Sequence, residues 1–451
     1  MKMKSSEKSP QVFSKHMTGK KTQEHLANFE RLLSEMIDPR PDKTGSLENI
    51  RVLEVSSANY PATICASMLG ELGAEVLKIE PPEGDPAREV TPYGVNIKGV
   101  GLPFLMENRN KRNITMDLST ETGRANLKKL AGGADVLIDA MKPGELDAIE
   151  AGYRHLSDVN PSLIYVAVSP FGHFTSKAER CRDIPDSDLT AQAESGFSML
   201  IGDPREPEPY NYPLRAGIWA ASYMSGALAT AGTLTALLHR NKTGEGQMVD
   251  IATNDAISAW QGFSAVWGFT MEQPRVRIGN FDWGLYPYGY YKAKDGYVTV
   301  CAALDHDFRG LLKILGRWDL EDDWKFLFDR LTDDPEKLQE LETEIEKEIA
   351  KYTCDELFRK TFEYGIKATR DKLRSKGFPI VVETKLPHQV VEEKHWQIRK
   401  SFQEVDVPGF GKITIPASPP QMSESPMRIK WIKGTIGEDD EEIYAQYGLE
   451  K

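Results

Sequence analysis

Cysteine is scarce in this chain of 451 residues: only four occur, at positions 65, 181, 301 and 354, and no two of them form a C-x-x-C pair. Scattered cysteines of this kind argue against a zinc site and a disulfide framework, and they fit a reducing compartment. None of the eight histidines pairs at metal-ligand spacing. We therefore expect no bound metal.

Long apolar runs are also missing. No stretch of 18 apolar residues occurs without a polar break, so the sequence predicts no membrane span. The first 21 residues are basic but have no apolar segment behind them, so we expect no secretory signal and a cytoplasmic location. The net charge of −12 argues against nucleic acid or an anionic membrane as the main partner.

Three common catalytic or cofactor-binding signatures are absent as well. The loop after the first predicted strand reads SSANYPA instead of G-x-G-x-x-G, so a dinucleotide site is unsupported. There is no G-x-x-x-x-G-K-[ST] and no G-x-S-x-G. A P-loop NTPase and a serine hydrolase of the α/β type are therefore not indicated.

The most informative absence is local: no Asp or Glu occurs between Glu208 and Glu245. This stretch contains an apolar run rich in small residues, from Ile218 to His239, with glycines at 226 and 232. The polar glycine turn NKTGEGQ and the β-rich segment MVDIAT follow it. The pattern predicts a long helix, a tight turn and a strand.

From Ile50 onwards, strand and helix patterns alternate. Short apolar strands are expected at 50–55, 74–79, 113–117, 135–138 and 163–168, with helices between them. This alternation predicts a mostly parallel sheet with helices on both faces. We expect a Rossmann-like α/β domain over 49–265 and 400–451, linkers and a smaller α+β domain over 266–399, and a partly disordered extension over 1–48 whose role stays open.

Five strings occur in the order and spacing of one family, over roughly residues 50–265. They are LGELGAEVLKIEPPEGDPAR (69–88), NRNKRNITMDL (108–118), ADVLIDAMKPG (134–144), NPSLIYVAVSPFG (160–172) and ALLHRNKTGEGQMVD (236–250). Together they resemble the class III CoA-transferase family, which includes formyl-CoA transferases, carnitine CoA-transferases and acyl-CoA racemases. The resemblance implies CoA and acyl-CoA as substrates, with no covalently bound cofactor.

In that family an Asp four residues before the helix glycine attacks the thioester. Counting back from Gly226, this chain has Ser222 there. The resemblance implies a mixed anhydride intermediate, which must stay as activated as a thioester for the exchange to be reversible. A carboxylate meets this demand, whereas a serine would give an ordinary ester and trap the acyl group. A serine hydroxyl is also too weak an acid for the racemase reaction. We therefore interpret Ser222 as catalytically inert.

The residues that resemble the family's CoA-binding region are degenerate. They are Tyr60, Lys78, Met141 and Lys142. Pro81-Pro82 and Ala148 stand where many members carry an arginine, and Met141-Lys142 stands where Phe-Arg is usual. No CoA-binding residue is therefore secure from the sequence.

The nearest other carboxylate candidate is Asp188, which lies where family members often carry an acidic active-site residue. Asp183, Asp186 and Asp188 also read as ordinary loop or N-cap acids, and Asp188 has good N-cap form ahead of LTAQA. Both interpretations stay open.

These departures predict a subunit of a heteromeric CoA-transferase that moves CoA between an acyl-CoA and a carboxylic acid, such as a dicarboxylic acid of the benzylsuccinate type. A related, Asp-bearing subunit would be its partner in a dimer of interlocked rings, as the resemblance implies. Two alternatives remain: a self-sufficient transferase or racemase that uses Asp188, and a pseudoenzyme that binds acyl-CoA without catalysis.

Overall fold

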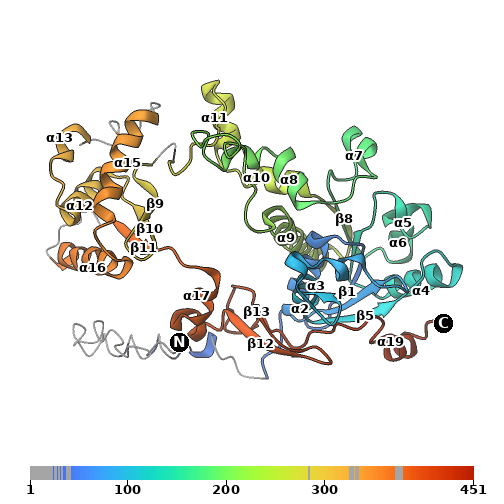
Figure 1. Cartoon of the computed structure of the whole chain (residues 1–451). Helices are drawn as coiled ribbons and strands as arrows, with labels where there is room; N and C mark the ends of the chain where they lie inside the picture. The colour runs from blue at the N-terminus through green and yellow to red at the C-terminus, as the bar shows by residue number, and fades with distance from the viewer. Residues whose placement is uncertain are drawn as a thin grey trace. The chain divides into compact units, whose positions relative to one another are not determined.

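The computed structural model describes residues 24, 28, 31, 34–36, 42–282, 285–324, 330, 335–370 and 379–450. Most of the extension predicted over 1–48 lies outside these residues. The chain divides into two compact units (Figure 1). The first contains the described residues up to Ser187, with Ala221–Ala256 and the chain from Lys394 onwards; the second contains Asp188–Ala220 and Ile257–Glu393. The domain boundaries expected at 265 and 399 stay predictions.

A six-stranded parallel sheet forms the core of the first unit. Its strands, in spatial order, are β5 (Lys111–Thr115), β2 (Glu75–Glu80), β1 (Arg51–Ser56), β6 (Val136–Ala140), β7 (Ile164–Ser169) and β8 (Gln247–Ala252). Numbered along the chain, this order is 3-2-1-4-5-6, the Rossmann arrangement. The predicted parallel α/β domain is confirmed, and each strand predicted between 50 and 168 lies within about two residues of its expected place.

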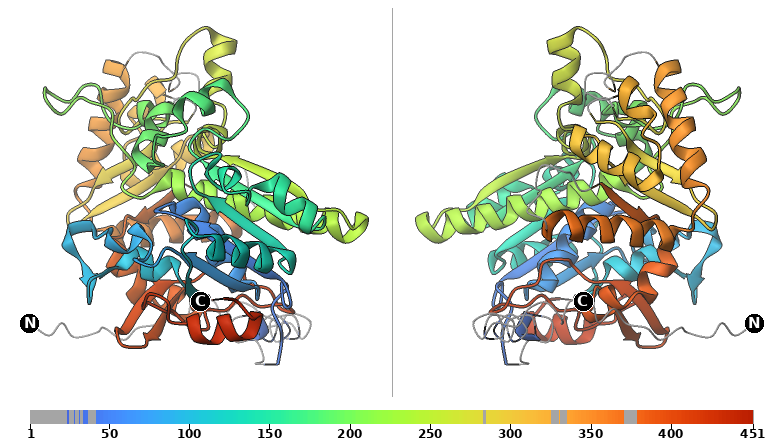
Figure 2. Two further views of the ribbon diagram at one scale, coloured as in Figure 1. Left: turned by 90° about the vertical axis from the view of Figure 1, so that its right-hand side faces the viewer. Right: turned by 90° about the vertical axis from the view of Figure 1, so that its left-hand side faces the viewer.

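Helices cover both faces of this sheet (Figure 2). One face carries α2 (Tyr60–Glu71) and α9 (Ala220–Thr243), which share an apolar core with alternate residues of β6 and β7. The other carries α4 (Glu121–Gly132), α6 (Tyr153–Val159) and α19 (Asp440–Tyr447). Thr120 caps α4, because its Oγ1 accepts a hydrogen bond of 3.0 Å from the Gly123 N–H.

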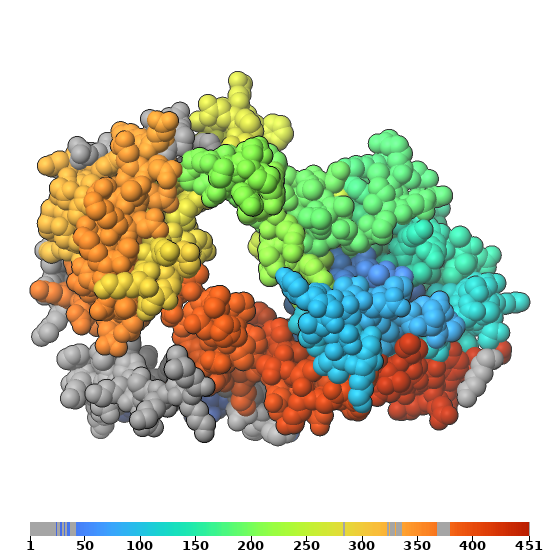
Figure 3. All heavy atoms as spheres, in the orientation of Figure 1, coloured from blue at the N-terminus to red at the C-terminus, as the bar shows by residue number. Residues whose placement is uncertain are grey.

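Shorter elements complete the first unit. They are η1 (Pro86–Glu89), η2 (Pro92–Gly94), β3 (Asn96–Ile97), β4 (Val100–Gly101), α3 (Leu102–Glu107), α5 (Glu145–Ala148), α7 (Ser176–Cys181), α18 (Lys394–Ile398), β12 (Phe402–Val407) and β13 (Gly411–Pro416). The β3–β4 segment, light blue in Figure 3, lies at the surface. Helix α10 (Thr253–Ala259) runs from the first unit into the second.

The second unit is of the α+β type, as predicted. Its antiparallel sheet has the order β11 (Ile380–Glu383), β10 (Tyr297–Cys301) and β9 (Tyr288–Lys292), and β9 and β10 form a hairpin around Lys294-Asp295-Gly296. Its helices are α8 (Asp188–Glu194), η3 (Phe197–Leu200), α11 (Ser264–Met271), α12 (Asp305–Leu315), α13 (Leu320–Trp324), α15 (Pro335–Ile349), α16 (Cys354–Arg370) and α17 (Pro387–Glu392).

Candidate functional site

The carboxyl ends of β1 and β6 mark the point where the strand order of the parallel sheet reverses. From β1 the chain continues to β2 on one side, whereas β6 lies on the other. The loops that follow these two strands therefore diverge to opposite sides and leave a crevice at the edge of the sheet, the usual ligand site of open α/β sheets.

A cavity of about 340 Å³ lies in this crevice, which we call the switch-point pocket. Three loops line it: 57–59 after β1, 141–143 after β6, and Ser169-Pro170 at the end of β7. Arg182 and Asp186 contribute from the connection between β7 and α8. Of the residues predicted for CoA binding, Met141 and Lys142 thus lie together in this pocket.

Ser169 is a pocket residue that the sequence reasoning missed. Its side chain is buried, and its Oγ has no hydrogen-bond partner among the described residues. A buried hydroxyl without a partner is costly, unless a ligand or water satisfies it. The position of Ser169 at the carboxyl end of a parallel strand is the one signal in the sequence that pointed to it.

Asn59 fixes the loop that separates β1 from α2. Its Oδ1 accepts a hydrogen bond of 3.0 Å from the Ala62 N–H and so caps α2. Its Nδ2 donates to Asp186 Oδ2 at 3.3 Å, and Thr253 Oγ1 donates to the same oxygen at 3.1 Å. The carboxylate of Asp186, predicted as a loop acid, thus joins three segments beside the pocket.

Lys78 does not line the pocket. Its ammonium group is fully buried, 2.9 Å from Glu54 Oε1 and 2.7 Å from Asp85 Oδ2. Burial alone would raise the pKa values of both carboxyls. The ammonium groups of Lys111 and Lys78 hold the pKa of Glu54 below its usual range, and Lys78 holds the pKa of Asp85 below its usual range. Asp85 in turn accepts from the Ala58 N–H at 2.8 Å, so this network holds the loop after β1 in place.

Tyr60, the remaining predicted residue, opens α2 directly behind Asn59. Its hydroxyl donates to the Ala87 carbonyl at 3.4 Å. Burial, reinforced by the charge of Asp85, raises the pKa of this phenol, which therefore stays protonated. Tyr60 connects α2 with the segment after β2 and is not among the residues that line the pocket.

A second cavity, of about 460 Å³, lies on the other side of the loop after β1. It is lined by the ends of β1, β2 and β5, and Met141 reaches both cavities. Pro81 and Pro82 form part of its wall. They occupy the place where the family resemblance implies an arginine, so this side of the loop carries no cation there. Glu80, Glu83 and Asp117 also line the cavity.

Ser222, at the predicted nucleophile position, lies in the first turn of α9 and is 5% exposed. The position of α9 is fixed by Gly226, one turn later. A Cβ on Gly226 would lie 2.7 Å from Ile64 Cγ2 and 2.9 Å from the Pro61 carbonyl oxygen, both on α2. Because only glycine permits this close approach, the glycine fixes the register of α9 against α2, and Ser222 with it.

Asp188 is the first residue of α8 in the second unit, close to its expected place as an N-cap. The carboxylate is half-buried, and its Oδ2 accepts a hydrogen bond of 2.5 Å from Gln192 Nε2. Gln192 is itself fully buried, and its Oε1 accepts from the Ala216 N–H at 2.8 Å. The Asp188 side chain is thus held in a defined orientation.

Another cavity, of about 490 Å³, is lined by residues of β6, β7 and β8 and by His173 and Arg182 from the chain after β7. His173 Nδ1 is 2.8 Å from Asp250 Oδ1, and Tyr165 donates to Asp139 Oδ2 at 2.5 Å. Burial raises the pKa of Asp139 to about 6, although the Tyr165 hydroxyl and the Met141 N–H bond its charged form. Sequence reasoning did not single out this group, although Asp139 is the next-to-last residue of β6.

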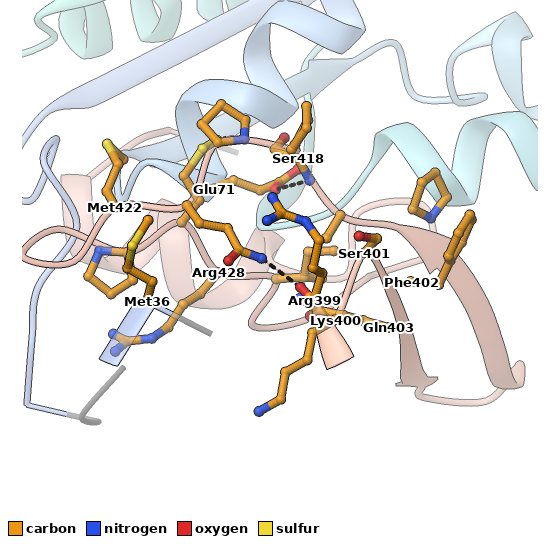
Figure 4. A pocket seen from close by; sticks show the side chains of 18 of the residues that line it. Met36, Glu71, Arg399, Lys400, Ser401, Phe402, Gln403, Ser418, Met422 and Arg428 are labelled. Atoms are coloured by element: carbon orange, nitrogen blue, oxygen red, sulfur yellow. Dashed lines mark hydrogen bonds between the residues drawn. The ribbon is translucent and has the colours of Figure 1, made fainter. Parts of the chain in front are cut away.

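A cavity of about 770 Å³ lies away from the switch point, between α2 and the C-terminal segment (Figure 4). Glu71 lies at one end, where its Oε2 accepts from the Ser418 N–H at 3.2 Å. Gln421 donates to the Arg399 carbonyl at 2.6 Å across the cavity. Its wall is rich in proline and methionine, and none of the predicted site residues line it.

Within the described part of the chain, no three His, Cys, Asp or Glu side chains come together to hold a metal ion. None of the described helices is long and apolar enough to cross a membrane.

Comparisons with known proteins agree with the geometry. The model of CoA-transferase family III matches residues 47–440. Succinyl-CoA–D-citramalate CoA-transferase of Chloroflexus aurantiacus is 29% identical over 414 residues, which cover 91% of this chain and 95% of that protein. The subunit BbsE of succinyl-CoA:(R)-benzylsuccinate CoA-transferase from Thauera aromatica is 38% identical over 208 residues, which cover 46% of this chain and 48% of BbsE.

Among solved structures, a CAIB/BAIF family protein from Brucella suis superimposes with a TM-score of 0.73 at 26% identity. The match covers 90% of this chain and 100% of that one.

Proposed function

The chain belongs to CoA-transferase family III, and on this premise we propose that it is the subunit without its own nucleophile in a heteromeric CoA-transferase. A related subunit, which carries the Asp, would supply the attacking carboxylate. The complex would move CoA between an acyl-CoA and a carboxylic acid.

The observation that carries this proposal is Ser222 in the first turn of α9. Because Gly226 packs closely against Ile64, α9 cannot shift along its axis by one residue. No other side chain of α9 can therefore take the position of Ser222. Since no Asp or Glu occurs between Glu208 and Glu245, α9 and the segment before it offer no substitute carboxylate. A reversible acyl transfer through an anhydride needs a carboxylate, so the chemistry must come from elsewhere.

We propose that the switch-point pocket and the cavity beside it take the CoA moiety. Their place at the carboxyl ends of β1, β2 and β6 supports this role. Lys142 is the cation that remains on the loop after β6, while Pro81, Pro82 and Ala148 supply no charge. Affinity for CoA in this subunit is expected to be lower than in a subunit with the full set of arginines.

A partner subunit is supported by the name of one of the relatives. BbsE is named as a subunit of the benzylsuccinate enzyme, so members of the family assemble with other chains. We propose an interlocked dimer with such a partner, with acyl groups of succinyl-CoA type and a dicarboxylic acceptor as the substrates. The relatives named for succinyl-CoA support this substrate class.

One observation favours the alternative of a self-sufficient enzyme. Asp188 is held by Gln192, a buried side chain that also fixes the Ala216 N–H shortly before α9. A carboxylate oriented in this way has the form of a catalytic residue. The same contacts also suit a helix-terminal acid, whose charge is favourable at the N-terminus of α8.

The deciding experiment compares the chain alone with the chain in its complex. It is expressed with a tag, alone and together with an Asp-bearing paralogue of the same organism, and CoA transfer from succinyl-CoA to a dicarboxylate is measured. We expect co-purification in equal amounts and transfer by the complex only. Turnover by the purified chain alone would establish the self-sufficient alternative instead.

A further inference from the structure

Arg182 lies between two cavities at the edge of the parallel sheet. It follows α7 directly, and it lines both the switch-point pocket and the cavity that contains His173 and Asp139. Helix α7 stands at the surface of the first unit (Figures 1 and 3). No motif of the sequence drew attention to this arginine, because it belongs to the polar connection between β7 and α8.

Two cations of the switch-point pocket share one carboxylate. Lys142 Nζ lies 3.6 Å from Asp183 Oδ1, and Arg182 Nε lies 3.9 Å from Asp183 Oδ2. Arg182 Nη1 also lies 3.7 Å from Oε1 of Glu179, another exposed carboxylate. These are long contacts between exposed groups: the side chains of Lys142, Arg182 and Asp183 are 62%, 54% and 78% exposed. Exposed ion pairs of this length contribute little to stability, so a better anion can displace the carboxylate at small cost.

The interior of the same pocket contains an independent sign of a ligand. Ser169 is 1% exposed, and its Oγ has no hydrogen-bond partner among the described residues. A polar ligand group at this depth would supply the missing bond. The pocket thus combines an unsatisfied hydroxyl in its interior with two weakly paired cations at its rim.

We propose that Arg182 binds a phosphate group of CoA at the rim of this pocket, and that Asp183 competes for Arg182 and Lys142 when the ligand is absent. This inference rests on the proposed function, since it requires that CoA enters the switch-point pocket. Pro81, Pro82 and Ala148 stand where many members of the family carry an arginine. The inference gives the role of such an arginine to Arg182, in a different segment of the chain.

The chemistry favours a phosphate over the carboxylate. A guanidinium donates two parallel N–H bonds to a phosphate, and charge-assisted bonds of this type are about twice as strong as neutral ones. A CoA phosphate also carries more charge than one carboxylate. The long contacts of Asp183 with Arg182 and Lys142 would therefore break when CoA binds. Because these contacts are weak, breaking them would lower the apparent affinity of the pocket for CoA only slightly.

The test measures binding of CoA and of 3′-dephospho-CoA to the complex by isothermal titration calorimetry. We expect Arg182→Ala to weaken CoA binding about tenfold, the loss typical of one charge-assisted contact at an exposed rim. Asp183→Asn should strengthen it by a small factor, on the order of two- to fivefold, because it removes the carboxylate that Arg182 and Lys142 share, while Glu179 remains beside Arg182. Arg180→Ala is the matched control, since Arg180 lies on α7, is exposed, and lines neither cavity.

The two ligands identify which phosphate is bound. If Arg182 holds the 3′-phosphate, Arg182→Ala leaves the affinity for 3′-dephospho-CoA unchanged; if it holds the diphosphate, the loss is equal for both ligands. Either result supports the inference. Equal affinities of the Arg182→Ala and Arg180→Ala variants for both ligands would overturn it, and weaker binding after Asp183→Asn would overturn the role of Asp183.

The outcome also separates this inference from the function it rests on. If the unaltered complex transfers CoA but Arg182→Ala has no effect, the inference fails and the proposed function stands. If the complex binds CoA no more tightly than the partner subunit does by itself, the proposed CoA site in this chain is wrong, and the inference on Arg182 is wrong with it. Equal thermal unfolding midpoints of the variants will show that the exposed substitutions leave the fold intact.

Discussion

A Cβ atom on Gly226 would lie 2.7 Å from Ile64 Cγ2, closer than side chains approach one another in folded proteins. The backbones of α2 and α9 therefore pack directly against each other at this point, over the face of the parallel sheet. This contact fixes where the first turn of α9 lies, and with it the place of Ser222, which we propose to stand at the position of the family's nucleophile.

Gly226→Ala should destabilise the first unit by about 1–3 kcal/mol, because the added methyl group overpacks a contact that includes a backbone carbonyl. Unfolding in urea will measure the change. The control is Gly217→Ala, since a Cβ at Gly217 would meet nothing within 4 Å. An unchanged midpoint for Gly226→Ala would contradict the fixed register of α9.

Lys78→Met should destabilise the protein by about 3–5 kcal/mol, because it leaves the buried carboxylates of Glu54 and Asp85 without their shared cation. The loop after β1 should become more mobile, since Asp85 holds it through the Ala58 N–H. Hydrogen exchange at residues 57–59 will report this change. Lys98→Met, at an exposed lysine, should leave both quantities unaltered.

Asp139 should give the stability a distinct dependence on pH. Its pKa is raised to about 6 in the folded protein from 3.8, so between these values the folded state binds a proton that the unfolded state releases. The contribution is therefore fully present below pH 3.8 and is lost as the pH rises through 6, by about 3 kcal/mol in total.

Asp139→Asn removes this titration. The stability difference between the unaltered protein and the variant should shift in favour of the variant as the pH rises from 4 to 7. Urea unfolding at several pH values will measure it. A difference that is constant across this range would show that Asp139 has an ordinary pKa.

Ser222→Ala should leave CoA transfer by the complex almost unchanged, because no bond to the serine forms during the reaction. The cost in stability should stay near 1 kcal/mol, since only one hydroxyl is removed. A hundredfold loss of turnover, with the complex intact, would mean that this hydroxyl takes part in the chemistry.

Asp188→Asn separates the two candidate functions. In a nucleophile-free subunit the amide keeps the shape of the side chain, and the initial rate of transfer should fall no more than a few-fold, through the contact with Gln192. In a self-sufficient enzyme the same change would abolish turnover. Steady-state rates of the complex will distinguish these outcomes.

Much of the fold was predictable because the signals are local. Strands β1, β2, β6 and β7 are short, mainly apolar runs buried on both faces. Thr120 and Lys294-Asp295-Gly296 carry the chemistry of a cap and a turn in the sequence itself. The division into compact units is different. It places Asp188–Ala220 with the second unit, through contacts between distant segments such as the Gly279 N–H with the Gly202 carbonyl at 3.0 Å. No periodicity encodes such a pairing.

The candidate site shows the same limit. Met141 and Lys142 were predictable because a motif places them at the end of a strand. The sequence could not distinguish Lys78, in a strand buried on both faces, from a lysine that faces a ligand. Ser169 had one signal in the sequence, its place at the end of β7. Arg182 reaches the pocket only through the path of the connection between β7 and α8.

The most direct test of the central claim is to trap the acyl intermediate in the working complex. The complex is incubated with acyl-CoA and quenched with hydroxylamine, which converts a carboxyl group activated as an anhydride into a hydroxamate, and the peptides of both subunits are analysed by mass spectrometry. We predict a hydroxamate on a carboxylate of the partner and none on this chain. An aspartyl hydroxamate at Asp188 would contradict the account and make this chain a catalytic subunit in its own right.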